Sequence, residues 1–107
     1  MQVTDKKKNI ANFRDSWLDD FFETNKGHRK IPETIKGALG RKLDIINAAD
    51  SHLDLRSPPG NRFETLNPPL EEYFSIRVND QYRLIFKWID GKAVDLYLDN
   101  HTYKATK

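Results

Sequence analysis

Residues 82–98, YRLIFKWIDGKAVDLYL, decide the fold class of this chain. Apolar and aromatic residues fill both ends of the segment, and Asp90-Gly91 separates them. An Asp-Gly pair between two such runs is a strong signal for a two-residue hairpin turn. The segment therefore predicts antiparallel strands over residues 82–89 and 93–98. Because side chains alternate along a strand, one face of the first would carry Tyr82, Leu84, Phe86 and Trp88, and the other Arg83, Ile85, Lys87 and Ile89.

The residues before this hairpin extend the predicted sheet. Tyr73–Val78 has the composition of a further strand, joined to the next one by a turn at Asn79-Asp80. Residues 50–72 contain four of the five prolines and are therefore expected to be loop, apart from a short strand over Phe63–Leu66. Another short strand is expected over Ile10–Phe13.

Two helices are predicted N-terminal to the sheet. The first begins at Asp15 or Ser16 and ends near Gly27, which can adopt a left-handed cap. The second runs from about Pro32 to Ala49, and its two glycines suggest a close helix–helix approach. Helical spacing marks the expected core residues, which are Trp17, Leu18, Phe21 and Phe22 in the first helix and Ile35, Leu39, Leu43, Ile46 and Ala49 in the second. We expect Trp17, Phe21 and Phe22 to be core residues rather than a ligand platform. The fold class is α+β, with two N-terminal helices packed on one face of an antiparallel β-sheet.

Length and composition narrow the classes of function. The 107 residues suit one domain, 1–107, in which residues 1–9 are expected to form a flexible extension. The 18 Lys+Arg against 16 Asp+Glu give a net charge of only +2, which excludes a uniformly cationic nucleic-acid coat but allows a local basic site. Without cysteine, the chain can form neither disulfides nor thiolate sites, and three isolated histidines predict no metal site. Short apolar runs and the lack of a signal-peptide core predict a soluble, cytoplasmic protein without a membrane partner.

Two arginines are the first candidates for chemistry. If the turn is centred on residues 79–81, Arg77 and Arg83 lie side by side on neighbouring strands, although a slip of one residue would separate them. Two adjacent guanidiniums repel each other, and this arrangement is favourable mainly when an anion such as phosphate lies between them. Alternatively, each arginine pairs with its own carboxylate, for which the sequence offers Glu64, Glu71, Glu72 and Asp80.

The histidines are weaker candidates. His101 follows Asp99 after the last strand, and a histidine oriented by an acid can serve as a general acid or base near neutral pH. The simpler alternative is an exposed histidine in the chain terminus. His28 and His52 lie in polar linkers and are expected on the solvated surface.

Two motifs together resemble a known family. The stretches LRSPPGNRFE, residues 55–64, and SIRVNDQYRLIF, residues 75–86, look like the HigB toxins, the plasmid maintenance killer branch of the RelE/ParE superfamily, and the resemblance covers about residues 10–101. It implies a RelE-like, microbial-RNase-type toxin fold and a ribosome-dependent endoribonuclease that cleaves translating mRNA in the A site and needs neither metal nor cofactor. It also implies neutralisation by a HigA-type helix-turn-helix antitoxin, whose complex with the toxin binds operator DNA.

The resemblance assigns roles to individual residues. Arg83 matches the arginine that contacts the scissile phosphate, Arg77 a basic position on the preceding strand, and Asp99 and His101 the C-terminal Asp-x-His. Arg56, Arg62, Asn67 and Lys87 are the expected RNA-binding residues. The chain departs from some relatives at three positions. Asn67 replaces a histidine, and Leu70 or Glu71 replaces a lysine. Asn100 replaces a tyrosine, although Tyr103 is close in sequence. These departures leave the general base unassigned.

Two other functions compete with the ribonuclease. A non-catalytic ParE-like toxin would bind a protein target such as gyrase on the same fold. A degenerate toxin would act only as a co-repressor of its operon. The charge pattern favours an RNA-facing surface, since acids gather on the first helix while Arg56, Arg62, Arg77 and Arg83 belong to the loop-and-sheet half.

Overall fold

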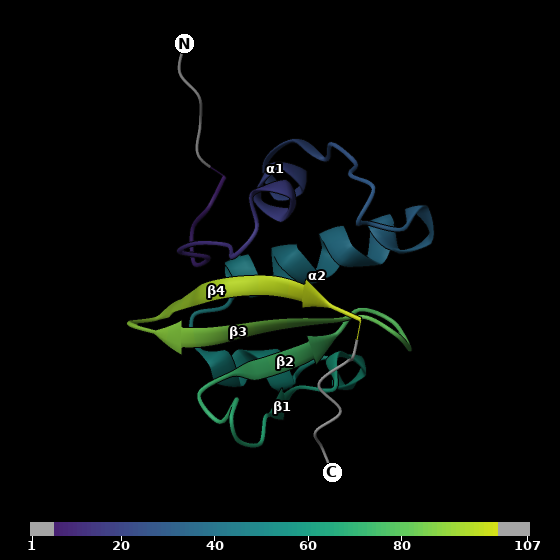
Figure 1. Cartoon of the computed structure of the whole chain (residues 1–107). Helices are drawn as coiled ribbons and strands as arrows, with labels where there is room; N and C mark the ends of the chain where they lie inside the picture. Colours follow the sequence, from purple (N-terminus) through teal and green to yellow (C-terminus); the bar gives the residue numbers. More distant parts are fainter. Residues whose placement is uncertain (1–5, 101–107) are drawn as a thin grey trace.

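The computed structural model describes residues 6–100, and its elements confirm an α+β chain with an antiparallel sheet. Four strands pair in the order β1-β2-β3-β4, all antiparallel (Figure 1). The strands are β1 (Glu64–Thr65), β2 (Phe74–Arg77), β3 (Arg83–Ile89) and β4 (Lys92–Asp99). The helices are α1 (Ser16–Thr24) and α2 (Lys36–Ala48), with 3₁₀ helices η1 (Glu33–Ile35), η2 (His52–Arg56) and η3 (Pro59–Asn61).

The hairpin from β3 to β4 has the predicted turn. Asp90 and Gly91 both have positive φ, 52° and 80°, which is the backbone that a type I′ turn requires at its two central residues. A β-bulge between Ile85 and Lys87 shifts the pairing of β3 with β4. The hairpin thereby fixes which side chains of β4 lie opposite those of β3.

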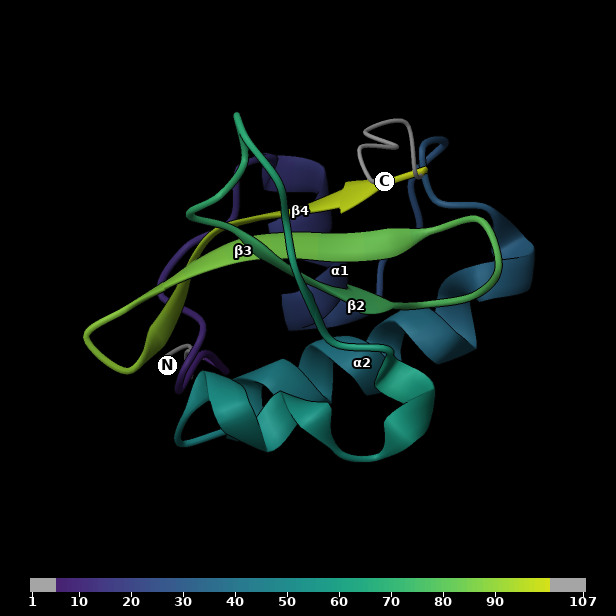
Figure 2. The ribbon, with the colours of Figure 1, turned by 90° about the horizontal axis from the view of Figure 1, so that it is seen from below.

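One face of the sheet packs against the helices. Leu84 and Phe86 of β3 and Ile76 of β2 are fully buried in one cluster with residues of both helices. Figures 1 and 2 show α2 running along this side of the sheet. The predicted apolar stripe of the second helix is confirmed, because all of its members are buried: Ile35, Leu39, Leu43, Ile46 and Ala49.

Three features of the helices differ from the prediction. The first helix is capped by Asn25, whose φ is 65°, rather than by Gly27, because asparagine also tolerates the left-handed region and its N–H reaches the carbonyl of Phe21. Pro32 precedes a 3₁₀ turn, and the α-helix begins only at Lys36. The expected close approach at the glycines is wrong, since a Cβ added at Gly40 would meet no atom within 4 Å.

The predicted strand over residues 10–13 is reduced to two isolated parallel bridges, Ile10 to Ala93 and Phe13 to Leu96. The segment before it, expected to be flexible, is anchored from Lys6 onward. The Oδ1 atom of Asn47 accepts the backbone N–H groups of Lys8, Asn9 and Ile10 at 2.7, 2.9 and 3.2 Å. Asn47 of α2 therefore fastens the start of the described chain to the helix layer.

The same segment neutralises part of the acidic first helix. The Lys7 ammonium lies 2.7 Å from a carboxylate oxygen of Asp19 and 2.8 Å from one of Glu23. These interactions raise the pKa of Lys7 against the opposing effect of its burial. The helix is thus less acidic as a surface than its sequence suggests.

The Asn47 clamp gives a stability prediction. Asn47→Ala leaves three backbone N–H groups without their side-chain acceptor, and we expect the free energy of unfolding to fall by about 1–2 kcal/mol. Urea denaturation measures this change, with Arg41→Ala, at an exposed position of the same helix, as the control. Equal stabilities of the two variants would contradict the clamp.

Candidate functional site

Three of the predicted site residues form a row across the sheet. Arg77 pairs with Arg83, and Arg83 pairs with Asp99, so the three lie in register on β2, β3 and β4. Directly opposite residues of antiparallel strands share a face, and this face is opposite to the one that holds Leu84 and Phe86. The expected side-by-side placement of the two arginines is therefore present.

Arg83 is the most buried charged residue of the row, with 6% of its surface exposed. Its Nε donates to the hydroxyl of Ser75 at 2.9 Å, and its Nη2 donates to the backbone carbonyl of Arg62 at 2.6 Å. A guanidinium has five N–H groups. Within residues 6–100, the remaining three have no hydrogen-bond acceptor. The guanidinium is thus fixed by two hydrogen bonds and keeps donors for a ligand.

The loop before β1 explains why the Arg62 carbonyl is in place. Asn61, which is fully buried, donates to the carbonyls of Leu55 and Ser57 at 3.1 Å and accepts from Lys42 Nζ at 2.6 Å. Arg62 follows in the left-handed region, with φ 47°. Sequence reasoning missed Asn61 and Ser75, although Asn61 is part of the Pro-Pro-Gly-Asn-Arg motif. The available signal was the position of Asn61 in a proline- and glycine-rich loop, where an asparagine side chain can hydrogen-bond to the backbone.

Both arginines have a carboxylate neighbour, as the alternative interpretation expected. Arg77 donates to Asp80, an exposed residue three positions along the chain. Arg83 Nη2 lies 3.8 Å from Glu64 Oε1, which is too long for a hydrogen bond, and the Glu64 side chain is 53% exposed. An ion pair with such an exposed partner contributes little to the stability of the fold. Glu64 therefore leaves the Arg83 guanidinium available.

A surface cavity of about 280 Å³ brings these groups together. Three arginines and two acids give it an excess of positive charge, and asparagine completes the lining: Arg62, Glu64, Arg77, Asn79, Asp80 and Arg83. Of the cavity arginines, Arg77 also acts on Lys42, whose pKa is lowered by burial and by the charges of Arg41 and Arg77. The cavity is suited to a small anion such as a phosphate group.

A second polar cluster lies on the same sheet face, near the β-bulge. Arg14 donates to both carboxylate oxygens of Asp95 at 3.0 and 2.8 Å, and Tyr73 donates to Asp95 at 2.7 Å. The Arg14 guanidinium also stacks on Tyr97, 3.7 Å from the ring centroid. These bonds from Arg14 hold the pKa of Asp95 below its usual range, and the bond to Asp95 raises the pKa of Tyr73. Sequence reasoning missed this cluster because its partners are 81 residues apart.

The expected RNA-binding residues do not form one group. Arg62 lines the arginine cavity, whereas Lys87 lies near the second cluster, with its Nζ 5.5 Å from the centroid of the Tyr73 ring. Arg56, at the end of η2, and Asn67, before the Pro68-Pro69 pair, are exposed and do not line that cavity. The predicted pairing of Asp99 with His101 involves a residue outside the described part of the chain.

The other two histidines are not the solvated residues that the sequence suggested. His52 is half-buried and stacks on Phe74, with ring centroids 4.8 Å apart. His28 is also half-buried and stacks on Trp17 at 5.3 Å. Each ring stacks on an aromatic residue of another segment of the chain, a contact that charge patterning cannot reveal.

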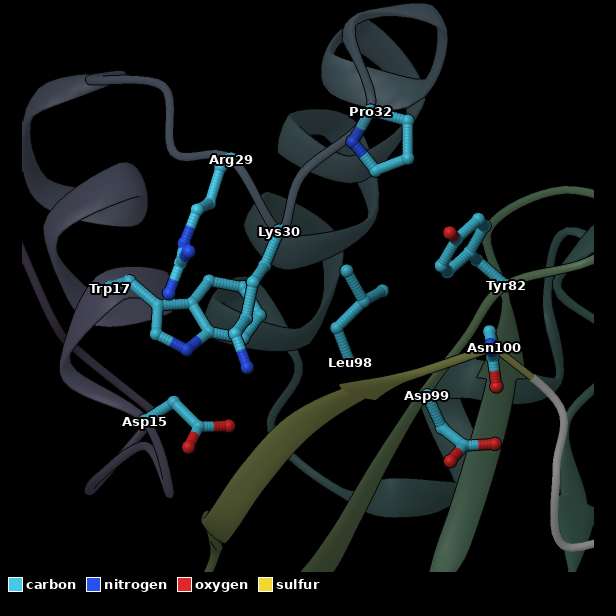
Figure 3. A pocket seen from close by; sticks show the side chains of 9 residues that line it. All are labelled: Asp15, Trp17, Arg29, Lys30, Pro32, Tyr82, Leu98, Asp99 and Asn100. Carbon is cyan, nitrogen blue, oxygen red and sulfur yellow. The ribbon is translucent and has the colours of Figure 1, made fainter.

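Trp17 is only half-buried, in contrast to Phe21 and Phe22 of the same helix. It lines a second cavity, of about 460 Å³, between α1 and the ends of β3 and β4 (Figure 3). The whole lining consists of Asp15, Trp17, Arg29, Lys30, Pro32, Tyr82, Leu98, Asp99 and Asn100. The expectation that Trp17 is simply a core residue is therefore incomplete.

Two further observations apply to residues 6–100. No three histidine or carboxylate side chains in this range are grouped so that they could hold a metal ion. None of the helices there has the length and apolar character needed to cross a membrane.

Comparisons with known proteins agree with the motifs. The family model of the "RelE-like toxin of type II toxin-antitoxin system HigB" matches residues 11–101. Toxin HigB-1 of Vibrio cholerae is 57% identical over 91 residues, which cover 85% of this chain and 96% of that protein. An uncharacterized protein of Haemophilus influenzae is 47% identical over 91 residues, covering 85% of this chain and 90% of its own length. The matched region includes the arginine row and both cavities.

The Asp95 cluster gives a prediction for pH. Because the pKa of Asp95 is lowered in the folded state, its contribution to stability is present above the unfolded-state pKa of about 3.9 and is lost as the pH falls through the folded-state pKa. Asp95→Asn preserves the left-handed backbone but removes the charge. We expect this variant to be less stable than the wild type at pH 6, with the difference shrinking toward pH 2.

Urea unfolding at several pH values measures this difference, with Asp50→Asn, at an exposed position, as the control. A gap between wild type and Asp95→Asn that is constant from pH 6 to pH 2 would show that the Asp95 carboxylate is not stabilised by Arg14.

Proposed function

The chain belongs to the HigB family of RelE-like toxins of type II toxin–antitoxin systems, and from this premise we propose that it is a ribosome-dependent mRNA endoribonuclease. The observation that carries the proposal is the fixed guanidinium of Arg83. It keeps three N–H groups without an acceptor among residues 6–100 and lies beside Arg77 in a cavity of about 280 Å³. On this proposal, residues 1–107 act as one toxin domain of the RNase-type fold, with its two N-terminal helices packed on the sheet.

The proposed reaction is an internal transesterification of RNA. The 2′-oxygen loses its proton and attacks the neighbouring phosphorus, the bond from phosphorus to the 5′-oxygen breaks, and that oxygen takes up a proton. The products are a 2′,3′-cyclic phosphate and a 5′-hydroxyl. Negative charge grows on the phosphoryl oxygens in between, and fixed donors aimed at such charge are the most effective catalytic groups.

The residue roles follow from this chemistry. Arg83 stabilises the phosphoryl oxygens because its guanidinium is already oriented by Ser75 and Arg62. Arg77 supports it from the neighbouring strand. Asp99, in register with Arg83, orients His101, to which we assign proton transfer. Arg56, Arg62, Asn67 and Lys87 bind the RNA on either side.

The partners follow from the family. A type II toxin has an antitoxin partner, and we propose that this one is a HigA-type helix-turn-helix protein whose complex with the toxin binds operator DNA. The ribosome and its mRNA are the other proposed partners, which places the activity in the cytoplasm.

One observation favours a non-catalytic alternative. Each arginine of the row has an acidic neighbour, Asp80 for Arg77 and Glu64 for Arg83, which a purely structural ion-pair network would also require. A toxin that only binds a protein target such as gyrase, or a degenerate toxin that only represses its operon, would retain these pairs and would not cleave RNA.

Arg83 provides the test. We expect Arg83→Ala to lower mRNA cleavage on ribosomes by about 100-fold or more, in line with the loss of a charge-stabilising donor. Arg83→Lys keeps the charge but not the forked donors, and should recover only a small part of the activity. His101→Gln should also impair cleavage. Mapping of new mRNA 5′ ends after induced expression measures all three variants.

Thermal unfolding of the Arg83 variants separates a loss of activity from a loss of fold, and Arg41→Ala, on the exposed side of α2, should cleave like the wild type. Growth arrest by the wild type without new mRNA 5′ ends would favour the protein-target alternative. Full cleavage by a folded Arg83→Ala variant would remove Arg83 from the mechanism.

A further inference from the structure

We propose that the cavity beside Trp17 binds a nucleobase of the RNA, next to the phosphate that Arg83 holds. The inference rests on the proposed function and adds a site to it. In Figure 3, Trp17, Arg29 and Lys30 stand on one side of the cavity, and Tyr82, Asp99 and Asn100 on the other, with Leu98 between them. Aromatic rings with polar groups around them are the usual lining of a site for an unstacked base.

Trp17 is held in place for such a role. It packs against the core cluster from α1, and His28, which is not part of the cavity lining, stacks on its indole with an angle of 16° between the rings. A half-buried indole that is supported in this way presents a rigid surface, and it loses little side-chain entropy when a flat ligand stacks on it.

The charges of the two cavities distinguish their ligands. The arginine cavity has three guanidiniums against two carboxylates and no aromatic ring, as expected for a phosphate site. Around Trp17, Arg29 and Lys30 are balanced by Asp15 and Asp99, so the formal charge of the lining is zero. A neutral flat group with hydrogen-bond donors and acceptors along its edge matches this lining better than a free anion does.

The size of the Trp17 cavity and its position beside the arginine cavity are also consistent with a nucleobase site. The volume of about 460 Å³ lies within the range of small-ligand sites. Tyr82, which lines the Trp17 cavity, precedes Arg83 in the chain, and Asp99, which also lines it, is the strand partner of Arg83. The two cavities are therefore neighbours at the start of β3 and the end of β4, although their linings share no residue. Arg83 and Asp99 lie on neighbouring strands, whose backbones are about 4.8 Å apart. A phosphate at Arg83 and a base at Trp17 can therefore belong to adjacent nucleotides of a chain that passes around these strand ends.

Binding is measured with RNA that cannot react. The probes are fluorescently labelled 2′-O-methyl trinucleotides of A, C, G or U, and the measurement is fluorescence anisotropy. We expect Trp17→Ala to raise Kd by about 5- to 150-fold, the range for loss of one stacked base, and Trp17→Phe to raise it much less. Arg29→Ala, at an exposed position, should raise Kd without affecting the fold, and Arg41→Ala should not change it.

A second readout does not depend on removing the indole. In a Trp88→Phe background, Trp17 is the remaining tryptophan, and unlabelled trinucleotides should quench its fluorescence. On ribosomes, Trp17→Ala should change the nucleotide preference at one position next to the cleavage site, whereas Arg83→Ala should lower cleavage at all sites.

The outcomes separate the two proposals. Quenching of Trp17 by RNA in a protein that cleaves no mRNA would support the base site and overturn the ribonuclease. Cleavage by the wild type, together with unchanged Kd values for Trp17→Ala and Arg29→Ala or with no quenching of Trp17, would overturn the base site alone. Loss of antitoxin binding by these variants, with RNA binding intact, would assign the cavity to the antitoxin instead.

Discussion

Burial of a guanidinium removes its hydration, so the protein must supply hydrogen-bond acceptors around the charge. Arg83 obtains them from the Ser75 hydroxyl on β2 and from the Arg62 carbonyl in the preceding loop. The first acceptor depends on the register of β2 with β3, and the second depends on Asn61, which closes the loop by three hydrogen bonds. The site therefore exists only when sheet, hairpin and loop are all correctly formed.

Alternation of side chains lets β3 serve two purposes. Leu84 and Phe86 point into the core and hold the sheet on the helices, while Arg83 and Lys87 belong to the opposite, polar face. Rigid packing on one side thus positions charged groups on the other. The cavity beside Trp17 lies where the two sides meet, at the strand ends.

The sequence predicted the local features of this protein and missed most of the distant ones. The Asp90-Gly91 turn specified the hairpin, and the turn after Arg77 specified the pairing with Arg83, because short turns leave few possible registers. The Arg14–Asp95 pair and the stacking of Trp17 on His28 depend on how separate segments meet in space, which periodicity does not describe. The role of Asn61 was missed because burial of a loop asparagine leaves no periodic signal.

The central claim is that a guanidinium fixed by Ser75 and Arg62 binds the reacting phosphate. A crystal structure with a 2′-O-methyl trinucleotide tests this claim most directly. The account predicts a phosphoryl oxygen at about 2.7–2.9 Å from a free N–H of Arg83, with the bonds to Ser75 and Arg62 retained. A phosphate bound elsewhere, with Arg83 making no contact to the RNA, would contradict it.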